Sequence, residues 1–294
     1  MLRKKKKDNS LKLKWMQQFF SIAGSIAPLA TVNILAKLFF TPSKRVLKPA
    51  EITLRRKARI FNIEVDEFRN PKNKLKLSCY SWGRGKKTIL LAHGWEGRAL
   101  DYYRIIPALV ERGYRVIGFD SPGHGSSEGE RSNMVDFKEV MYQLVKNKIG
   151  VPYAIIAHSM GAGAAAFMLV EHDIRVEKFV AITIPTVSRK FFENVLSMMK
   201  VPDKMQQAFF AGMSEQYGED IDHYNLVERS EPIKANDMLI IYDAQDEVIN
   251  PKDTREFLAR HPEIKGVEMS GIGHYGLLRN KHVIDLVIDF IDDK

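Results

Sequence analysis

Short apolar runs and longer helical repeats alternate along most of this chain. From residue 61 onward, runs of mainly apolar residues are separated by stretches in which apolar residues recur every three or four positions. The short runs predict buried strands, and the repeats predict amphipathic helices. The expected strands are Ile63–Phe68, Leu75–Trp82, Thr88–Ala92, Arg115–Phe119, Tyr153–Ala157, Lys178–Thr183, Met238–Tyr242 and Lys265–Met269.

The expected helices fall between these strands. Near-continuous apolar strands joined by helices are typical of a mostly parallel sheet with helices on both faces, so the pattern predicts a doubly wound α/β fold. One interval, approximately 185–236, shows only two helical patterns and predicts a short helical insertion that acts as a lid over the carboxyl edge of the sheet. The helices are Leu100–Arg112, Asn133–Lys148, Met160–His172, Thr254–Arg260 and Val283–Asp292, with Arg189–Lys200 and Asp203–Tyr217 in the insertion.

The first 60 residues lack this alternation. They predict a basic N-terminal arm and linker, followed by a domain over 61–294. Trp15–Ala36 is a stretch of 22 uncharged residues in which polar side chains recur on one stripe, which favours an amphipathic helix. Three interpretations remain open: a helix at a membrane surface or docked on the core, a membrane anchor, and a cleaved signal. Thr41–Pro49 predicts an extended linker because prolines disfavour helix.

The net charge of +9 is unevenly distributed. Residues 1–60 hold 15 Lys and Arg against 2 Asp and Glu, which leaves 30 and 34 in the remaining chain. The predicted domain is therefore mildly acidic, and a nucleic-acid partner is not expected. The basic arm predicts contact between residues 1–40 and an anionic membrane surface, since each nearby Lys or Arg contributes about 1 kcal/mol there.

Neither a disulfide nor a metal centre is expected. Cys79 is the single cysteine, which excludes an intrachain disulfide and a CxxC site. The eight histidines show no metal-ligand spacing, and no HExxH motif occurs. We therefore predict no cofactor and no metal.

One strand leads into a turn that suits a nucleophile. After Tyr153–Ala157 the chain reads Ala157-His-Ser159-Met-Gly161 and continues into an alanine-rich helix. A serine on a sharp strand-to-helix turn needs small residues two positions before and after it, because strand and helix pass closely there. Ala157 and Gly161 meet this requirement, although the usual G-x-S-x-G motif has glycine at the first position.

Here residues 61–294 resemble the α/β-hydrolase family. Within that family the chain is most similar to serine hydrolases of the esterase and lipase type. The resemblance implies that Ser159 is the nucleophile, that Asp246 in the loop after Met238–Tyr242 is the acid, and that His274 is the base. Asp243 is a second candidate for the acid.

The resemblance also implies an oxyanion hole and a reaction. The loop His93-Gly94-Trp95 resembles the family's HG motif, so the backbone N–H groups of Trp95 and Met160 are expected to stabilise the developing negative charge. The implied function is cleavage of a carboxylic ester, a thioester or an amide in a small-molecule or lipid substrate, through an acyl-enzyme.

Two other functions remain possible. They are acyl transfer to an acceptor other than water, and membrane-associated binding without catalysis on a hydrolase fold. Aromatic and methionine side chains of the insertion either line an acyl pocket or pack its two helices onto the core. The sequence predicts a cytoplasmic protein that is peripheral to the membrane or anchored in it by the N-terminal segment.

Overall fold

A computed structural model describes residues 2–68 and 70–293, and the side chains of residues 14–27, 30–68 and 70–293. The chain forms two compact units. The smaller joins the residues up to Phe40 with Val187–Asn225, and the larger joins Thr41–Thr186 with the residues from Leu226 onward. The larger unit starts before the expected boundary at residue 60, because Leu54 lies in its core and the Leu54 carbonyl accepts a hydrogen bond from the Trp82 indole at 3.1 Å.

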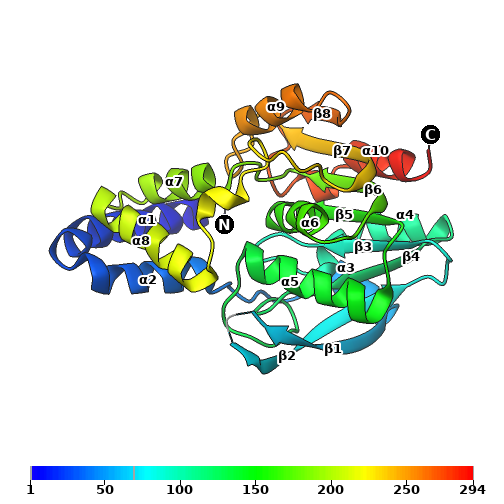
Figure 1. Ribbon diagram of the computed structural model, residues 1–294, viewed down its shortest axis with the longest axis horizontal. Helices are drawn as coiled ribbons and strands as arrows, with labels where there is room; N and C mark the ends of the chain where they lie inside the picture. Colours follow the sequence, from blue (N-terminus) through cyan, green and yellow to red (C-terminus); the bar gives the residue numbers. More distant parts are fainter. Residues whose placement is uncertain (1, 69, 294) are drawn as a thin grey trace. The chain divides into compact units, whose positions relative to one another are not determined.

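An eight-stranded sheet forms the larger unit, in the order β1-β2-β4-β3-β5-β6-β7-β8 (Figure 1). The pairings of β1 with β2 and of β2 with β4 are antiparallel, and the other pairings are parallel. This confirms the predicted mostly parallel sheet. The strands are β1 (Arg59–Glu67), β2 (Asn70–Trp82), β3 (Thr88–Ala92), β4 (Arg115–Phe119), β5 (Ala154–His158), β6 (Val176–Ile182), β7 (Ala235–Asp243) and β8 (Lys265–Met269).

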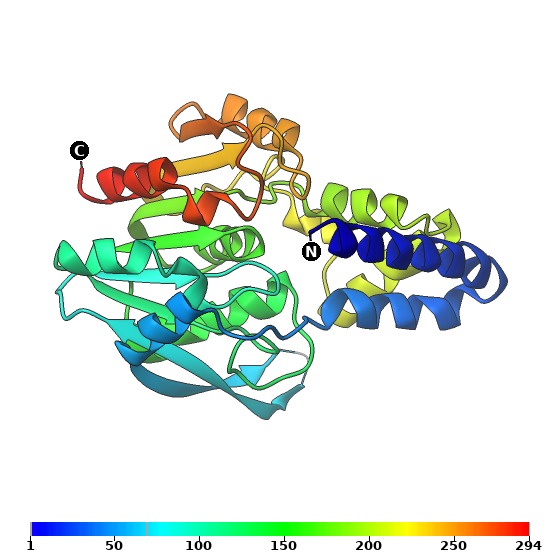
Figure 2. The same cartoon turned by 180° about the vertical axis from the view of Figure 1, so that it is seen from behind.

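Helices cover both faces of the sheet, as the doubly wound prediction requires. α5 and α6 lie on one face (Figure 1), and α3, α4 and α10 lie on the opposite face (Figure 2). The helices of this unit are α3 (Pro49–Arg56), α4 (Ile105–Glu111), α5 (Met134–Leu144), α6 (Met160–Glu171), α9 (Pro251–Arg260) and α10 (Lys281–Ile291).

Burial follows the sequence pattern. Every residue of β5 is buried, as expected for a central strand with both faces covered, whereas burial in the middle of the edge strand β1 alternates. The Gly- and Ala-rich helix α6 is buried on almost all sides. Small side chains let it pass close to the sheet, and this close passage shapes the turn that precedes it.

The helix predicted at Leu100–Arg112 is interrupted. A 3-10 turn over Ala99–Tyr102 (η1) precedes α4, which starts at Ile105. Pro107 explains the break, because it has no N–H to donate and its ring would collide with the carbonyl four residues earlier in a continuous helix. In the first turn of a helix, where those N–H groups have no helical partner, proline is tolerated.

The smaller unit is helical and joins segments that are distant in the sequence. Gln17 donates a hydrogen bond to the Met198 carbonyl at 2.7 Å, and a Cβ atom on Gly24 would lie only 2.8 Å from the Met205 sulfur. The N-terminal helices thus pack on the predicted insertion. The elements are α1 (Leu2–Ile26), α2 (Pro28–Phe40), α7 (Ser188–Met198), α8 (Asp203–Tyr217) and the 3-10 turn η3 (Ile221–Tyr224).

Aromatic side chains form the centre of this unit. The Phe39 ring lies 5.5 Å from that of Phe209 and 5.9 Å from that of Phe192, and the Phe40 ring stacks on Phe209 at 6.0 Å. The aromatic residues of the insertion therefore pack against the N-terminal helix α2. The sequence analysis considered two partners for these residues, the core and an acyl chain, and did not consider α2.

The uncharged stretch Trp15–Ala36 is divided between two helices. α1 ends at Ile26 and α2 begins at Pro28, where proline suits the first helical position. Within the part of the chain that the structure describes, no helix has an apolar stretch long enough to cross a bilayer.

Candidate active site

Ser159 lies on a strained turn between β5 and α6. Its backbone adopts φ 54° and ψ −126°, a conformation that non-glycine residues rarely adopt. Its N–H donates to the Thr183 carbonyl at 2.9 Å, which ties the turn to the end of the neighbouring strand β6. A Cβ atom on Gly161 would lie 2.3 Å from the His93 carbonyl oxygen, so glycine is required there. The turn holds the serine hydroxyl at the carboxyl edge of the sheet.

The structure brings Ser159, His274 and Asp246 together. The Ser159 Oγ lies 2.9 Å from His274 Nε2, and His274 Nδ1 lies 2.8 Å from Asp246 Oδ2. All three residues are buried. A carboxylate next to Nδ1 requires the ring proton on that nitrogen, which leaves Nε2 free to accept a proton from the serine.

Asp246 is held as a carboxylate. Burial alone would raise its pKa, but the hydrogen bond and charge of His274, together with backbone N–H groups, hold the pKa of Asp246 below its usual value. Oδ1 accepts hydrogen bonds from the N–H groups of Val248 at 2.8 Å and Ile249 at 2.9 Å. The Thr183 hydroxyl donates to Oδ2 at 3.0 Å.

Asp243, the second candidate for the acid, has a different position. One of its oxygens accepts the N–H of Gln245 and the other accepts the N–H of Ile272, each at 2.8 Å. These bonds fix the two loops that carry Asp246 and His274. Asp243 therefore holds the two loops in place, whereas Asp246 is the carboxylate beside the imidazole.

The loop after β3 lies against the nucleophile. A Cβ atom on Gly94 would lie 3.0 Å from the Ser159 Cβ atom, so the backbone approaches the serine closely. The Gly94 carbonyl accepts the Gly97 N–H at 3.0 Å and faces His93 Nδ1 at 2.7 Å. Because a peptide unit is planar, fixing this carbonyl also fixes the direction of the Trp95 N–H. The other expected donor, Met160 N–H, belongs to the first residue of α6.

His93 and His158 support the site as neutral rings. The Ser121 N–H donates to His93 Nε2 at 3.0 Å, so His93 carries its proton on Nδ1 and donates it to the Gly94 carbonyl. Burial lowers the pKa of His93 well below its usual value. His158 Nε2 lies 3.2 Å from the His274 carbonyl, and burial followed by the charge of His274 lowers the pKa of His158 to about 3.

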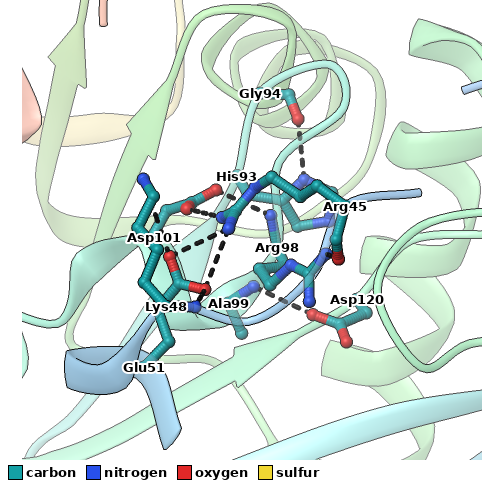
Figure 3. Close-up of polar contacts among 9 residues, drawn as sticks. All are labelled: Arg45, Lys48, Glu51, His93, Gly94, Arg98, Ala99, Asp101 and Asp120. Carbon is teal, nitrogen blue, oxygen red and sulfur yellow. Dashed lines mark hydrogen bonds and ion pairs between the residues drawn. The ribbon is translucent and has the colours of Figure 1, made fainter. Parts of the chain in front are cut away.

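A partly buried polar cluster that the sequence did not reveal adjoins the loop after β3. Arg45 lies between the carboxylates of Glu51 and Asp101, and the Arg98 guanidinium donates to the Arg45 carbonyl (Figure 3). Asp120 accepts the Ala99 N–H at 2.9 Å. These residues come from separate parts of the sequence and form no motif, so only the fold brings them together.

No metal-binding cluster occurs among the residues that the structure describes: nowhere do three His, Cys, Asp or Glu side chains come together in a way that could hold an ion. Cys79 is buried in β2, and burial raises its thiol pKa to about 12, which disfavours the reactive thiolate.

Comparisons with known proteins give the same fold. Residues 87–216 match the family model described as alpha/beta hydrolase fold. A serine hydrolase-like protein of Dictyostelium discoideum is 29% identical over 112 residues, which cover 36% of this chain and 31% of that protein. The chain thus spans about a third of the length of this curated relative.

Two solved structures are similar over most of the chain. Alpha/beta hydrolase domain-containing protein 10 from mouse has a TM-score of 0.63 at 14% identity, over 80% of this chain and 98% of that one. An esterase from Pyrococcus furiosus has a TM-score of 0.60 at 19% identity, over 86% of this chain and 96% of that one. At such identities the likeness concerns the fold.

Proposed function

The chain is an α/β hydrolase in fold, and from this premise we propose that it is a serine hydrolase that cleaves a carboxylic ester. One observation carries the proposal: Ser159 Oγ, His274 and Asp246 form a buried hydrogen-bonded series with separations of 2.9 Å and 2.8 Å. The strained backbone of Ser159 supports it, because strain of this kind concentrates at functional sites.

In the proposed reaction, Ser159 Oγ attacks the ester carbonyl carbon while His274 Nε2 takes the hydroxyl proton. The Trp95 and Met160 N–H groups stabilise the oxyanion. The intermediate then breaks its bond to the leaving-group oxygen, which receives the proton from His274, and an acyl-serine remains. Water, deprotonated by His274, attacks the acyl carbon. The bond from that carbon to Ser159 Oγ then breaks, Oγ takes the proton from His274, and the acid is released. Asp246 stabilises the imidazolium in both halves.

The test is hydrolysis of a chain-length series of p-nitrophenyl esters by the full chain and by its Ser159→Ala variant. A fluorophosphonate probe should label the first protein and not the second. Equal turnover by the two proteins would exclude the mechanism. Labelling without hydrolysis, followed by product formation when an alcohol or amine is added, would identify acyl transfer instead, and a folded protein that never labels would favour binding without catalysis.

A membrane partner belongs to the same proposal. Along α1, Trp15, Phe19, Ile22 and Ile26 recur at intervals of four, three and four, which places them on one face, and Trp15 is 72% exposed. Phe20 on the other face is buried. An exposed apolar stripe next to a lysine-rich sequence is typical of a helix that lies on an anionic bilayer. The lysines before Lys14 lie outside the described side chains.

Vesicle sedimentation tests this partner. The full chain should sediment with vesicles that contain phosphatidylglycerol, less with pure phosphatidylcholine, and less again when Trp15 and Ile22 are replaced by serine. Val151→Ser, which alters an exposed apolar residue of the larger unit, is the matched control. Equal binding to neutral vesicles would contradict the role of charge. Self-association that disappears in the double variant would assign the stripe to a second copy of the chain.

A further inference from the structure

An extended segment of the chain binds directly to the loop that carries the Trp95 N–H. This segment, Thr41–Lys48, is called here the strap, and residues 93–98 are called the oxyanion loop; the strap connects α2 with α3. The Ser43 N–H donates to the Glu96 carboxylate at 3.0 Å, and Arg98 Nη2 donates to the Arg45 carbonyl at 2.6 Å. The strap thus contacts the oxyanion loop at two points.

Arg45 is the centre of these contacts. Its Nη1 lies 2.9 Å from each oxygen of Glu51, and its Nη2 donates to Asp101 (Figure 3). Glu51 has no exposed surface, and it also accepts the Lys48 N–H at 3.1 Å at the start of α3. A planar guanidinium between two carboxylates fixes direction as well as distance, which a lysine at this place would not do.

Asp101 carries this constraint into the oxyanion loop. Its Oδ2 accepts the Arg98 N–H at 2.9 Å. The same oxygen would lie 3.0 Å from a Cβ atom on Gly97, so the carboxylate packs against that glycine. The Gly97 N–H in turn holds the Gly94 carbonyl at 3.0 Å. Gly94 and Trp95 share that peptide unit, so the chain of contacts from Arg45 ends at the expected oxyanion donor.

We propose that Arg45 is a positioning residue for the oxyanion loop, acting through Asp101 and Arg98, with Ser43 and Glu96 as a second, weaker clamp. This inference rests on the proposed acyl-serine mechanism. A loosened loop misplaces the Trp95 N–H, which stabilises the transition state more than the bound ester. Arg45→Met should therefore lower kcat by about 10- to 100-fold and change KM by less than about threefold.

The experiment separates positioning from stability by counting active sites. Fluorophosphonate, taken to complete labelling, titrates reactive Ser159, and kcat for p-nitrophenyl butyrate is expressed per titrated site. The inhibition constant of a trifluoromethyl ketone with the same acyl chain reports oxyanion stabilisation, because its adduct with serine carries that charge. For Arg45→Met, the inhibition constant should rise by the same factor as kcat falls, and Arg45→Lys should lie between this variant and the wild type.

Two further variants test the inference even if the Arg45 variants do not fold. Glu96→Ala removes an exposed contact to the strap and should lower kcat per site by about 3- to 10-fold, a fraction of the 10²- to 10³-fold loss of a whole donor. Arg112→Ala removes a comparable ion pair, between Arg112, which follows α4, and Asp292, which follows α10, at 2.8 Å, and should leave both readouts unchanged.

The outcomes are distinct. Unchanged kcat per site and an unchanged inhibition constant in Arg45→Met and Glu96→Ala, with only the titratable fraction or the melting temperature reduced, would overturn the inference. Arg45 would then act only in folding. A wild-type protein that neither labels nor hydrolyses esters would overturn the proposed function, and the inference with it. That result is recognised before any variant is made.

Discussion

A substitution at Asp246 should change catalysis strongly and stability only slightly. Its Oδ1 accepts the N–H groups of Val248 and Ile249, while Oδ2 faces His274 Nδ1 at 2.8 Å. In Asp246→Asn, the amide oxygen must occupy the Oδ1 position, because an NH2 group there would face two backbone N–H donors. The NH2 group is therefore directed at His274 and cannot flip away.

This orientation reverses the imidazole. His274 Nδ1 must accept a hydrogen bond from the amide, so the ring proton moves to Nε2 and points at Ser159 Oγ, 2.9 Å away. The base is then blocked, and the imidazolium also loses its carboxylate. We expect kcat to fall by about 10³- to 10⁴-fold, or roughly 4–5.5 kcal/mol, as in other triads with this exchange. The free energy of unfolding should change by about 1 kcal/mol, since both backbone bonds remain.

Asp243→Asn is the matched control. Its two oxygens each accept a backbone N–H, from Gln245 and Ile272, so either orientation of the amide places NH2 against a donor. The free energy of unfolding should fall by about 1–3 kcal/mol. Because the same bonds fix the loops that carry Asp246 and His274, kcat per folded molecule should fall as well, but far less than in Asp246→Asn. The assays are p-nitrophenyl butyrate turnover and thermal unfolding. An Asp246→Asn protein that keeps kcat within tenfold of wild type would refute the assignment of the acid.

Three other predictions use other parts of the molecule. The pKa of His158 is about 3 in the fold and about 6.5 in the unfolded chain, so stability should fall as pH drops from 6.5 toward 3, and thermal melts of His158→Gln should show a shallower decline. Gly161→Ala places a Cβ 2.3 Å from the His93 carbonyl and should cost about 2–4 kcal/mol in urea unfolding, whereas Gly212→Ala, with no atom within 4 Å, should stabilise slightly. Deleting residues 1–40 removes the aromatic partners of the insertion, so limited proteolysis should cut within 187–225 while the larger unit stays resistant.

The sequence predicted the parts of the fold whose causes are local. A run of apolar residues such as β5, a small-residue turn and an alanine-rich helix follow one another within 20 residues, and their stereochemistry requires no distant partner. The choice between Asp243 and Asp246 is different in kind. Both follow β7 on one loop, and only the backbone N–H groups that fold around each carboxylate decide which of them faces the imidazole.

The partners of the N-terminal helices could not be predicted, because the pattern of one helix does not identify the surface it packs on. Trp15–Ala36 shows that one face must be covered, but the contact between Gln17 and Met198 joins residues 181 positions apart. The aromatic pairs between α2 and α8 have the same origin. Amphipathic periodicity predicts that burial occurs, and only the tertiary structure shows which segment supplies it.

The contacts of the N-terminal region change how its positive charge is interpreted. As composition, the 15 basic residues before position 61 indicate a single cationic arm. Arg45, however, is bound between Glu51 and Asp101, and its own pKa is raised because their hydrogen bond and charges outweigh its burial. A guanidinium held in this way is not available to a membrane surface. The segment therefore has two electrostatic parts: the lysine-rich sequence before Trp15, which the membrane proposal uses, and the strap, whose arginine acts inside the larger unit. Substitutions in one part should leave the readout of the other unchanged, so vesicle binding and turnover can be measured on the same set of variants.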